Sequence, residues 1–325
     1  MKYTEFGLIN KIRNDFLFDD EGIIGIGDDA AVISFFNKNL LITTDALVDG
    51  KHFLSEKVDF FLLGYKSLAV NISDIAAMGG KPLFFLLTLG LSDYLDDSQI
   101  DMFFYGLKSI SKEYCIHLIG GDCVGAKDFF VSITLLGEPF SKPILRRGAK
   151  AKENIYVTGS IGDSAFGLSL LLGKEELLLE EKDFFIERHL KPVPRVGWME
   201  KIISMYKISS AIDVSDGLLG DLIHIAEESK CGFELYLDRI PLSKEKIGAK
   251  FCEMELNYIL QAITGGEDYE IIFTSPDEID VEKLEKEYKI KVTKIGSMVD
   301  EGYNLFFKER MIDFAEIKKV SFTHF

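Results

Sequence analysis

The chain has 325 residues, 47% of them hydrophobic and 28% charged, which is enough for one large domain or two of medium size. Lys and Arg number 37 against 53 Asp and Glu, and the formal net charge of -16 would repel a nucleic-acid backbone. The four cysteines show no metal-binding spacing, and neither a signal peptide nor a membrane span is apparent. We therefore expect a cytoplasmic protein that binds neither nucleic acid nor membrane.

The first half of the chain reads as a mixture of helices and strands. Apolar residues at helical spacing predict a helix over residues 3–16. The runs AAVISFF and LLITTD follow, and the turn residues NKN between them predict a hairpin. A helix is predicted over residues 60–78, because its pattern ends at a Gly-Gly pair followed by Pro82. The remaining segments are predicted as strand PLFFLLTLGL, helix SQIDMFFYGLKSISKEY, and strands CIHLIGG and FFVSITLLGE.

The second half repeats this mixture after the polar and basic stretch SKPILRRGAKAKENI. It holds predicted helices around SAFGLSLLL, DFFIERHL, VGWMEKIISMY and LLGDLIHIAEESK, and predicted strands IYVTG, AIDVSDG, GFELYL and YEIIFTS. We place a domain boundary near residue 145, giving domains 1–145 and 146–325. The fold class is α/β (α+β), with two domains facing one site.

The stretch GIGDDA fits a dinucleotide-binding fingerprint, and Asp45 lies where that fingerprint wants a ribose-binding acid. However, AAVISFF is too short and too β-branched for the helix that must follow the glycines. Asp28 and Asp29 would also repel a pyrophosphate by about 4 kcal/mol per close pair at an effective dielectric near 20. An NAD-dependent oxidoreductase is therefore a weak alternative.

Several aspartates share a setting that surface acids lack, because small or apolar residues flank them and most end a predicted strand. Asp74 lies within a helix whose neighbouring side chains would bury it, so its carboxylate needs a cation or strong donors. Oxygen ligands without histidine or cysteine favour Mg²⁺, which also binds substrate phosphates. The candidate magnesium ligands are Asp28, Asp45, Asp74, Asp122, Asp213 and Asp216.

The motifs GIGDDAAV, LLITTDALVDGKHF, SLAVNISDIAAMGGKP, YVTGSIGDSAFGL, RHLKPVPR, DVSDGLLGDL, TGGEDYE and the closing FTHF occur in the order typical of one family. In this ordered set the chain resembles the thiamine-monophosphate kinases. The resemblance implies the fold of aminoimidazole ribonucleotide synthetase, with an N-terminal domain that dimerises through its sheet and a C-terminal domain that closes over the ATP site. It also implies that ATP and thiamine monophosphate react to give ADP and thiamine diphosphate, the last step of thiamine diphosphate biosynthesis.

The resemblance assigns roles to motif positions of this chain. Those matching magnesium-binding positions are Asp28, Thr43, Thr44, Asp45, Asp74, Asp122, Asp213 and Asp216. Those matching nucleotide contacts are Tyr105, Gly121, Asp122, Arg146 and Ser215, and those matching substrate contacts are His52, Glu267 and Phe322. Phe322 stands where the family often has tryptophan, so it keeps a stacking face and lacks the indole donor.

The chemistry needs no general base, since the acceptor is a phosphate monoester that is largely ionised at neutral pH. We expect direct in-line transfer with magnesium and without a phosphoenzyme. The nearest alternative is another ATP-using enzyme of the same fold, and a third is a nucleotide-binding module without turnover. His189 receives no role, and Tyr105, Arg146 and Glu267 would be ordinary helix, linker and turn residues without the family pattern.

Overall fold

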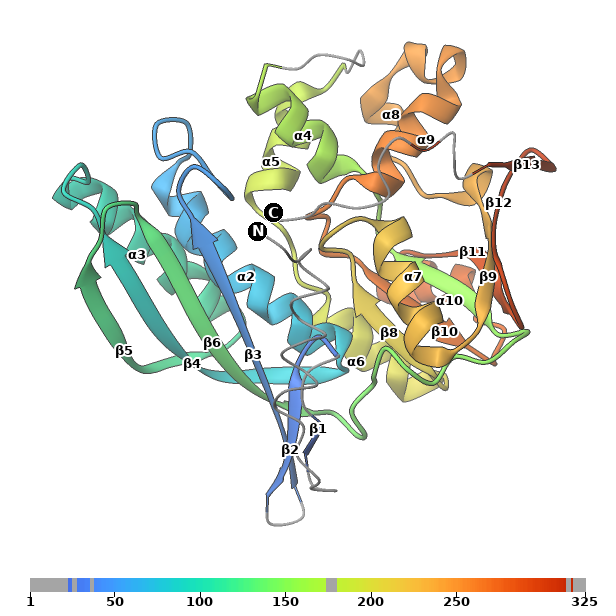
Figure 1. Ribbon diagram of the computed structural model, residues 1–325, viewed down its shortest axis with the longest axis horizontal. Helices are drawn as coiled ribbons and strands as arrows, with labels where there is room; N and C mark the ends of the chain where they lie inside the picture. Colours follow the sequence, from blue (N-terminus) through green and yellow to red (C-terminus); the bar gives the residue numbers. More distant parts are fainter. Residues whose placement is uncertain (1–22, 25–27, 36–37, 174–179, 314–316, 318–325) are drawn as a thin grey trace, which may run out of the picture.

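The computed structural model describes residues 23–24, 28–35, 38–173, 180–313 and 317. Figure 1 shows two sheets side by side, one from the N-terminal half of the chain and one from the C-terminal half. This arrangement confirms the predicted mixed α/β class with two sheet-containing halves. The boundary predicted near residue 145 falls in the segment that joins the two sheets, and it stays a prediction. The helix predicted over residues 3–16 lies outside the described residues.

The first sheet has the strand order β1-β2-β3-β6-β4-β5. β2 and β3 form the predicted antiparallel hairpin, in which Ala31 pairs with Ile42. Among the strands that the structure describes, β5 pairs only with β4, in parallel, and so forms one edge of the sheet. The strands are β1 (Ile23–Ile24), β2 (Ala31–Phe35), β3 (Lys38–Val48), β4 (Gly80–Leu91), β5 (His117–Gly125) and β6 (Phe130–Pro139).

Two helices, α2 (Phe60–Ala77) and α3 (Asp97–Glu113), cover one face of this sheet (Figure 1). The Asp59 side chain caps α2 by accepting from two backbone N–H groups of its first turn. α2 ends before Gly79, whose φ of 66° suits a residue without a side chain. α3 begins with a reciprocal capping box between Asp96 and Gln99. These local signals account for the good agreement with the predicted helix bounds.

α2 and α3 cross so closely that their backbones touch. A Cβ atom on Gly64 would lie 1.9 Å from the carbonyl oxygen of Phe103, and one on Gly106 would lie 1.8 Å from that of Phe61. No side chain fits at either crossing point without moving a helix.

We therefore expect Gly106→Ala to lower the free energy of unfolding by about 1–3 kcal/mol or more, because the helices must separate. Gly197→Ala is the matched control. Gly197 lies exposed in the first turn of α6 (Val196–Met205), with no atom within 4 Å of an added Cβ. That change should be neutral or stabilising by about 0.5 kcal/mol. Urea unfolding of both variants measures the difference, and equal stabilities would contradict the close crossing.

The second sheet has the order β13-β12-β9-β11-β7-β10-β8 and is mostly antiparallel, with β9 and β12 running parallel. α7 (Leu218–Ser229) packs on β8, β9 and β10, and α10 (Val281–Tyr288) packs on β11. Its strands are β7 (Asn154–Thr158), β8 (Ser210–Asp213), β9 (Gly232–Tyr236), β10 (Ile271–Ser275), β11 (Val292–Val299), β12 (Tyr303–Phe307) and β13 (Arg310–Ile312). Besides α6, the described helices of the C-terminal half are α4 (Asp163–Leu171), α5 (Lys182–Leu190), α7 (Leu218–Ser229), α8 (Lys244–Ile247), α9 (Glu255–Thr264) and α10 (Val281–Tyr288). The described part of this half also has two 3-10 helical turns, Leu237–Arg239 and Ala249–Glu253.

One apolar core runs through the seam between the halves. Met199 and Ile202 of α6, together with Phe273 of β10, are fully buried in the same cluster as Leu63 and Leu68 of α2. A second cluster lies wholly within the C-terminal half, around Phe166, Phe233 and their neighbours. The two halves are therefore joined by a buried apolar contact, which fixes their loops relative to one another. No helix among the described residues is long and apolar enough to cross a bilayer.

Candidate active site

Three aspartates from distant parts of the sequence meet at the seam between the two sheets. Asp29 precedes β2, Asp74 lies in α2, and Asp213 ends β8. One carboxylate oxygen of each lies within 4.8 Å of the others. Asp29 and Asp213 are buried and Asp74 is half-buried, so the helix does not enclose Asp74 as fully as its neighbours predicted. Asp74 is therefore the most accessible of the three acids.

Short hydrogen bonds orient these carboxylates. Thr43 of β3 donates its hydroxyl to Asp74 at 2.5 Å, and Ser73 donates to Asp213 at 2.6 Å. Asn71, one turn earlier on α2, accepts the backbone N–H of Asp45 at 3.1 Å. Because Asn71, Ser73 and Asp74 all belong to α2, one rigid helix positions acids from both halves.

The electrostatics of this cluster fit a bound cation. Burial and the nearby charges of Asp45, Asp213 and Asp29 raise the pKa of Asp74 well above its usual value. Burial and Asp29 likewise raise the pKa of Asp213. Oδ2 of Asp29 is buried without a hydrogen-bond partner among the described residues. Carboxylates that repel one another and leave a buried oxygen unsatisfied are the donor set that a hard divalent cation stabilises.

Arg146 closes one side of the cluster. Its backbone N–H donates to Asp28 at 2.6 Å, and its guanidinium donates through Nε and Nη2 to Oδ1 of Asp29. Burial acts to lower the pKa of Arg146, but the Asp29 carboxylate raises it on balance, so the guanidinium stays charged. A partly exposed cation, whose side chain is 24% exposed, is thus held beside the acids, in reach of an anionic ligand.

The loop between β8 and α7 carries Ser215 and Asp216. Oδ2 of the buried Asp221 accepts the backbone N–H groups of Ser215, Asp216 and Gly217 at 3.1–3.2 Å. Asp221, the last acid of the motif DVSDGLLGDL, therefore fixes the conformation of the loop that precedes it, and the sequence pattern did not indicate this role. Asp221 shapes the loop that presents the two predicted site residues.

Glu267 lies in the loop between α9 and β10, directly against the β8–α7 loop. Its N–H donates to the carbonyl oxygen of Ser215 at 2.8 Å, and its φ is 65°. A Cβ on the preceding Gly266 would lie 2.2 Å from the same oxygen, so the motif needs glycine there. The predicted substrate residue therefore borders the predicted nucleotide residue.

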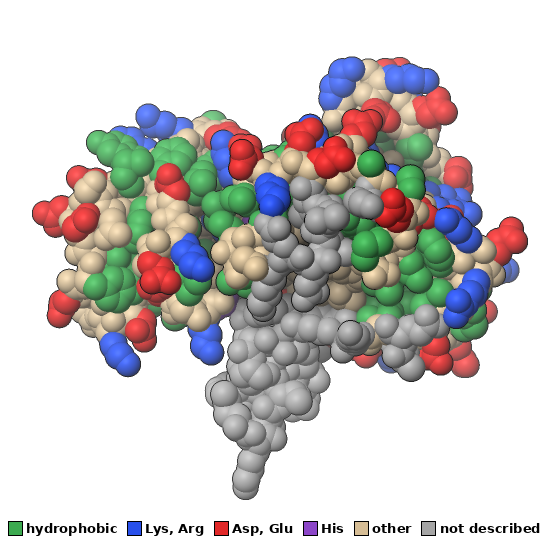
Figure 2. Space-filling model, turned by 90° about the horizontal axis from the view of Figure 1, so that it is seen from above, with side chains coloured by type: hydrophobic (Ala, Val, Ile, Leu, Met, Phe, Trp, Pro, Cys, Tyr) green, Lys and Arg blue, Asp and Glu red, His purple; other side chains and the backbone are tan. Residues whose placement is uncertain are grey.

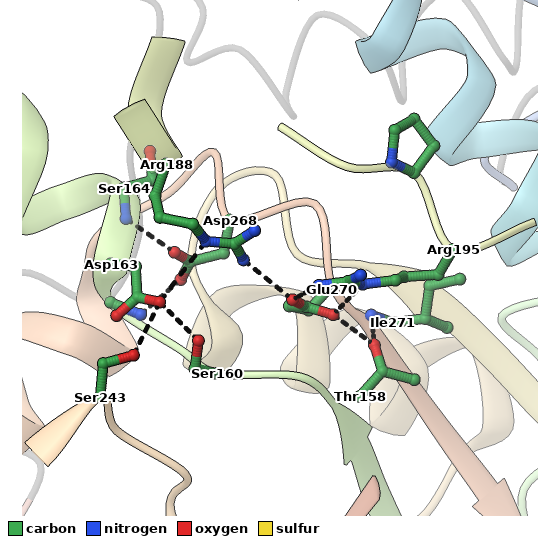
Figure 3. A network of polar contacts seen from close by, with 12 residues as sticks. Thr158, Ser160, Asp163, Ser164, Arg188, Arg195, Ser243, Asp268, Glu270 and Ile271 are labelled. Carbon is green, nitrogen blue, oxygen red and sulfur yellow. Dashed lines mark hydrogen bonds and ion pairs between the residues drawn. The ribbon is translucent and has the colours of Figure 1, made fainter. Parts of the chain in front are cut away.

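A second polar network lies beside the site and includes Glu270 (Figure 3). The fully buried Glu270 pairs with Arg195 through both carboxylate oxygens, and it also accepts from Arg188 at 3.1 Å and from Thr158 at 2.7 Å. Arg188 also contacts Asp163, which accepts from Ser160 and Ser243. The network ties β7, α4, α5 and α6 to the GGEDYE loop, so its role is to fix the loop that carries Glu267.

Two predicted magnesium ligands lie apart from the aspartate cluster. The side chain of Thr44 is exposed and contacts Ile133 and Thr134, because it points to the opposite face of β3 from Thr43 and Asp45. Asp122 lies exposed on β5, in the register row that runs from Ala46 through Ser132 and Thr88. Thr44 and Asp122 therefore share the outer face of the first sheet, and their assignment as ligands stays a prediction.

The remaining predicted residues are divided between the seam and the outer surface. Gly121 also lies on the exposed strand β5, and Tyr105 is 62% exposed on α3. His52 lies in the β3–α2 loop, where its Nδ1 accepts the N–H of Val48 at 3.0 Å. Phe322 lies outside the described residues. The seam thus gathers most of the predicted ligands and also Asp29, Asp221, Lys66 and His189, which sequence reasoning passed over.

Known families, relatives and solved structures match most of this chain. The families described as "AIR synthase related protein, N-terminal domain" and "C-terminal domain" match residues 27–138 and 152–308. A thiamine-monophosphate kinase of Buchnera aphidicola is 40% identical over 100% of both chains, and one of Aquifex aeolicus is 34% identical over 99% of this chain and 98% of its own. The chain belongs to the thiamine-monophosphate kinase family. A solved structure described as AaThiL complexed with AMPPCP and TMP matches with a TM-score of 0.83 and 32% identity, covering 100% of this chain and 99% of that one.

Membership of the thiamine-monophosphate kinase family confirms the resemblance on which the residue roles were assigned, together with the fold that it implied. The roles themselves rest on the positions described above. The kinase family motifs GIGDDAAV, NISDIAAM and DVSDG meet at the seam, since Asp29, Asp74 and Asp213 come from one motif each. The motif GGED adjoins DVSDG through the hydrogen bond from Glu267 to Ser215.

Proposed function

We propose that this chain catalyses the ATP-dependent phosphorylation of thiamine monophosphate to thiamine diphosphate. The observation that carries the proposal is the meeting of Asp29, Asp74 and Asp213 within 4.8 Å, in a chain of the thiamine-monophosphate kinase family. The similar solved structure is described as holding AMPPCP and TMP, an ATP analogue and the acceptor of this reaction. In this proposal Ser215 and Arg146 bind the nucleotide, and Glu267 and His52 bind thiamine monophosphate.

Magnesium fits the aspartate cluster, whose donors are carboxylates and a threonine hydroxyl without histidine or cysteine. Asp28, Asp29, Asp45, Asp74, Asp213 and Asp216 would hold it, with Thr43 beside them. When bound, it would supply the charge neutralisation that transfer of a phosphoryl group between two anions needs. Thr44 and Asp122 are proposed as further ligands from the outer face of the sheet.

The residues of the chain would bind and align the reactants. Arg146 would place a fixed positive charge next to the phosphates, and α2 would hold Asp74 and Asp213 in one geometry. The acceptor phosphate is already an ionised nucleophile at neutral pH, so no side chain needs to take up a proton. We therefore propose direct in-line attack on the γ-phosphate of ATP.

The experiment is an assay of the purified full chain with ATP, Mg²⁺ and thiamine monophosphate, followed by chromatography for thiamine diphosphate. Formation of thiamine diphosphate that stops with EDTA and resumes with Mg²⁺ is the expected result. A folded protein that hydrolyses ATP but leaves thiamine monophosphate unchanged would point to another ATP-using activity of this fold.

We also propose that two copies of the chain pair through the first sheet in the cytoplasm. All nine residues of the edge strand β5 are exposed, and its apolar side chains include Leu118 at 49% and Ile119 at 56% exposure. Phe84 and Leu86 of the neighbouring strand β4 are exposed as well. Figure 2 shows hydrophobic side chains at the surface of the half that carries this sheet. A long, exposed apolar edge strand can pair with the same strand of another chain. The four cysteines are free thiols, which suits the reducing environment of the cytoplasm.

Ile119→Lys is expected to convert the dimer to a monomer, because it places a charge in the middle of the edge. Sedimentation velocity at micromolar concentration measures the change. Met311→Lys, at an equally exposed apolar residue of β13 in the other half, should leave the mass unchanged. A wild-type chain that sediments as a monomer would refute the pairing without affecting the kinase assay.

A further inference from the structure

The Lys66 side chain is a buried cation that the phosphoryl-transfer chemistry does not use. It lies in the middle of α2, where the residue is only 4% exposed and is surrounded by the core of the first half. A lysine in such a place is costly unless an anion accompanies it. Its partner comes from the other half of the chain, since Nζ of Lys66 lies 3.2 Å from Oε2 of Glu267.

A second basic side chain reaches the same oxygen. Nδ1 of His189, in α5, lies 3.4 Å from Oε2 of Glu267 and 2.9 Å from Oγ of Ser164. Burial and the charge of Lys66 lower the pKa of His189 to about 3, so the imidazole is neutral at pH 7. Lys66 is therefore the charged partner of Glu267, and His189 is a neutral one.

Exposure distinguishes the residue that can touch a ligand from those that support it. The side chains of Lys66 and His189 are each 5% exposed, whereas that of Glu267 is 24% exposed. Burial acts to raise the pKa of Glu267, but the charge of Lys66 and its hydrogen bond to the carboxylate lower the pKa on balance. Glu267 therefore presents an ionised carboxylate to the site, and the two basic groups lie behind it.

The surroundings of Glu267 place it beside the aspartate cluster. Its backbone N–H donates to the carbonyl oxygen of Ser215 at 2.8 Å, and the N–H of Tyr269 donates to that of Val214 at 2.9 Å. Val214 and Ser215 directly follow Asp213, so the loop that carries Glu267 runs alongside the end of the strand that carries this aspartate. If the aspartate cluster holds the phosphates, Glu267 faces the remainder of the acceptor, which in thiamine monophosphate carries a quaternary cation and an amino group.

We propose that Lys66 and His189 are positioning residues, which hold the Glu267 carboxylate in place for the cationic, amino-bearing part of thiamine monophosphate. This inference rests on the proposed function. Neither residue contacts the acceptor in this account, and each acts through Glu267. Removal of either should weaken acceptor binding and leave nucleotide binding intact.

The test is a double-mutant cycle of Lys66→Met and Glu267→Gln in the full-length protein, with KM and kcat measured for both substrates. Each single change should raise KM for thiamine monophosphate roughly 10- to 100-fold and leave KM for ATP within about twofold. The double variant should match Glu267→Gln alone, because the group that Lys66 positions is already lost. Lys66→Arg should recover most of the loss, and Lys283→Met, at an exposed lysine of α10, should change neither KM.

The inference would be overturned if the rises in KM for thiamine monophosphate caused by Lys66→Met and Glu267→Gln multiply in the double variant. It would also be overturned if KM for ATP rises as much as KM for thiamine monophosphate. Thermal melting checks that each variant is folded. If Lys66→Met does not fold, the same cycle is run with His189→Asn, whose amide nitrogen replaces Nδ1. A wild-type chain that forms no thiamine diphosphate refutes the proposed function instead, so the two failures are distinguishable.

Discussion

Asp74→Asn is expected to lower kcat by roughly 10³-fold while the metal-free protein melts no lower than wild type. The substitution keeps the size of the side chain and an oxygen that can accept from Thr43, but it removes one of the charges that crowd the cluster. Thiamine diphosphate formation and differential scanning fluorimetry in EDTA provide the two measurements. A loss of activity accompanied by an equal loss of folded protein would assign Asp74 a structural role.

The effect of Asp74→Asn on stability should depend on pH in a definite direction. The pKa of Asp74 is raised in the folded state, so folding favours its protonated form. Its contribution to stability is present below the unfolded pKa of about 3.9 and is lost as the pH rises through the folded pKa. The Tm of Asp74→Asn minus that of wild type should therefore become more positive from about pH 4 to pH 7.

Asp101→Asn is the matched control for this pH series. Asp101 is exposed on α3, so the Asp101→Asn variant should keep the activity of wild type. The difference between its Tm and that of wild type should not change with pH.

Added Mg²⁺ should stabilise wild type more than Asp74→Asn at pH 7, since ligand binding stabilises the state that binds it. A wild-type protein whose Tm does not respond to Mg²⁺, with or without nucleotide, would contradict the proposed metal site.

Glu270→Gln should destabilise the fold by about 3–5 kcal/mol, the usual cost of removing one partner from a buried ion pair. Glu270 is fully buried, and Gln would leave Arg188 and Arg195 without its charge in the seam (Figure 3). Burial acts to raise the pKa of Glu270, but Arg195 and Arg188 lower it on balance. Its stabilising contribution is therefore present above the unfolded pKa and disappears as the pH falls through the folded pKa.

Urea unfolding at pH 7 measures this loss of stability. The difference in free energy of unfolding between Glu270→Gln and wild type should become smaller at acidic pH. Glu282→Gln is the control, because the Glu282–Lys286 pair lies on the surface with side chains 77% and 75% exposed. That change should stay within about 0.5 kcal/mol. Similar free energies of unfolding for Glu270→Gln and Glu282→Gln would mean that the Glu270 network adds little to the stability of the fold.

The sequence predicted the helices and the hairpin well, because their signals are local. The cap at Asp59, the Gly-Gly stop after α2 and the turn between β2 and β3 each act over a few residues. Two aspartates of the cluster, Asp74 and Asp213, were also found, because acids flanked by apolar residues are unusual wherever they occur. The contacts of Lys66 and His189 were not, since an ordinary helical lysine gives no sign of a partner 201 residues away.

The division of ligands between two faces was within reach of the sequence. Thr43, Thr44 and Asp45 are consecutive in a predicted strand, and successive side chains of a strand point to opposite faces. Thr44 therefore had to leave the face that Thr43 and Asp45 share. Asp29 was passed over for a different reason, because two adjacent aspartates give no indication of which one faces inward until the position of Arg146 is known.

The burial of α6 against α2 has a consequence for how this protein folds and moves. Residues 1–145 alone would lack Met199 and Ile202, and would leave bare the apolar surface that these side chains cover. The N-terminal half is then not a self-sufficient folding unit, and we expect the chain to lose its structure in one cooperative step. Swinging one half away from the other would expose the same surface, so we expect the two sheets to stay in place while reactants bind.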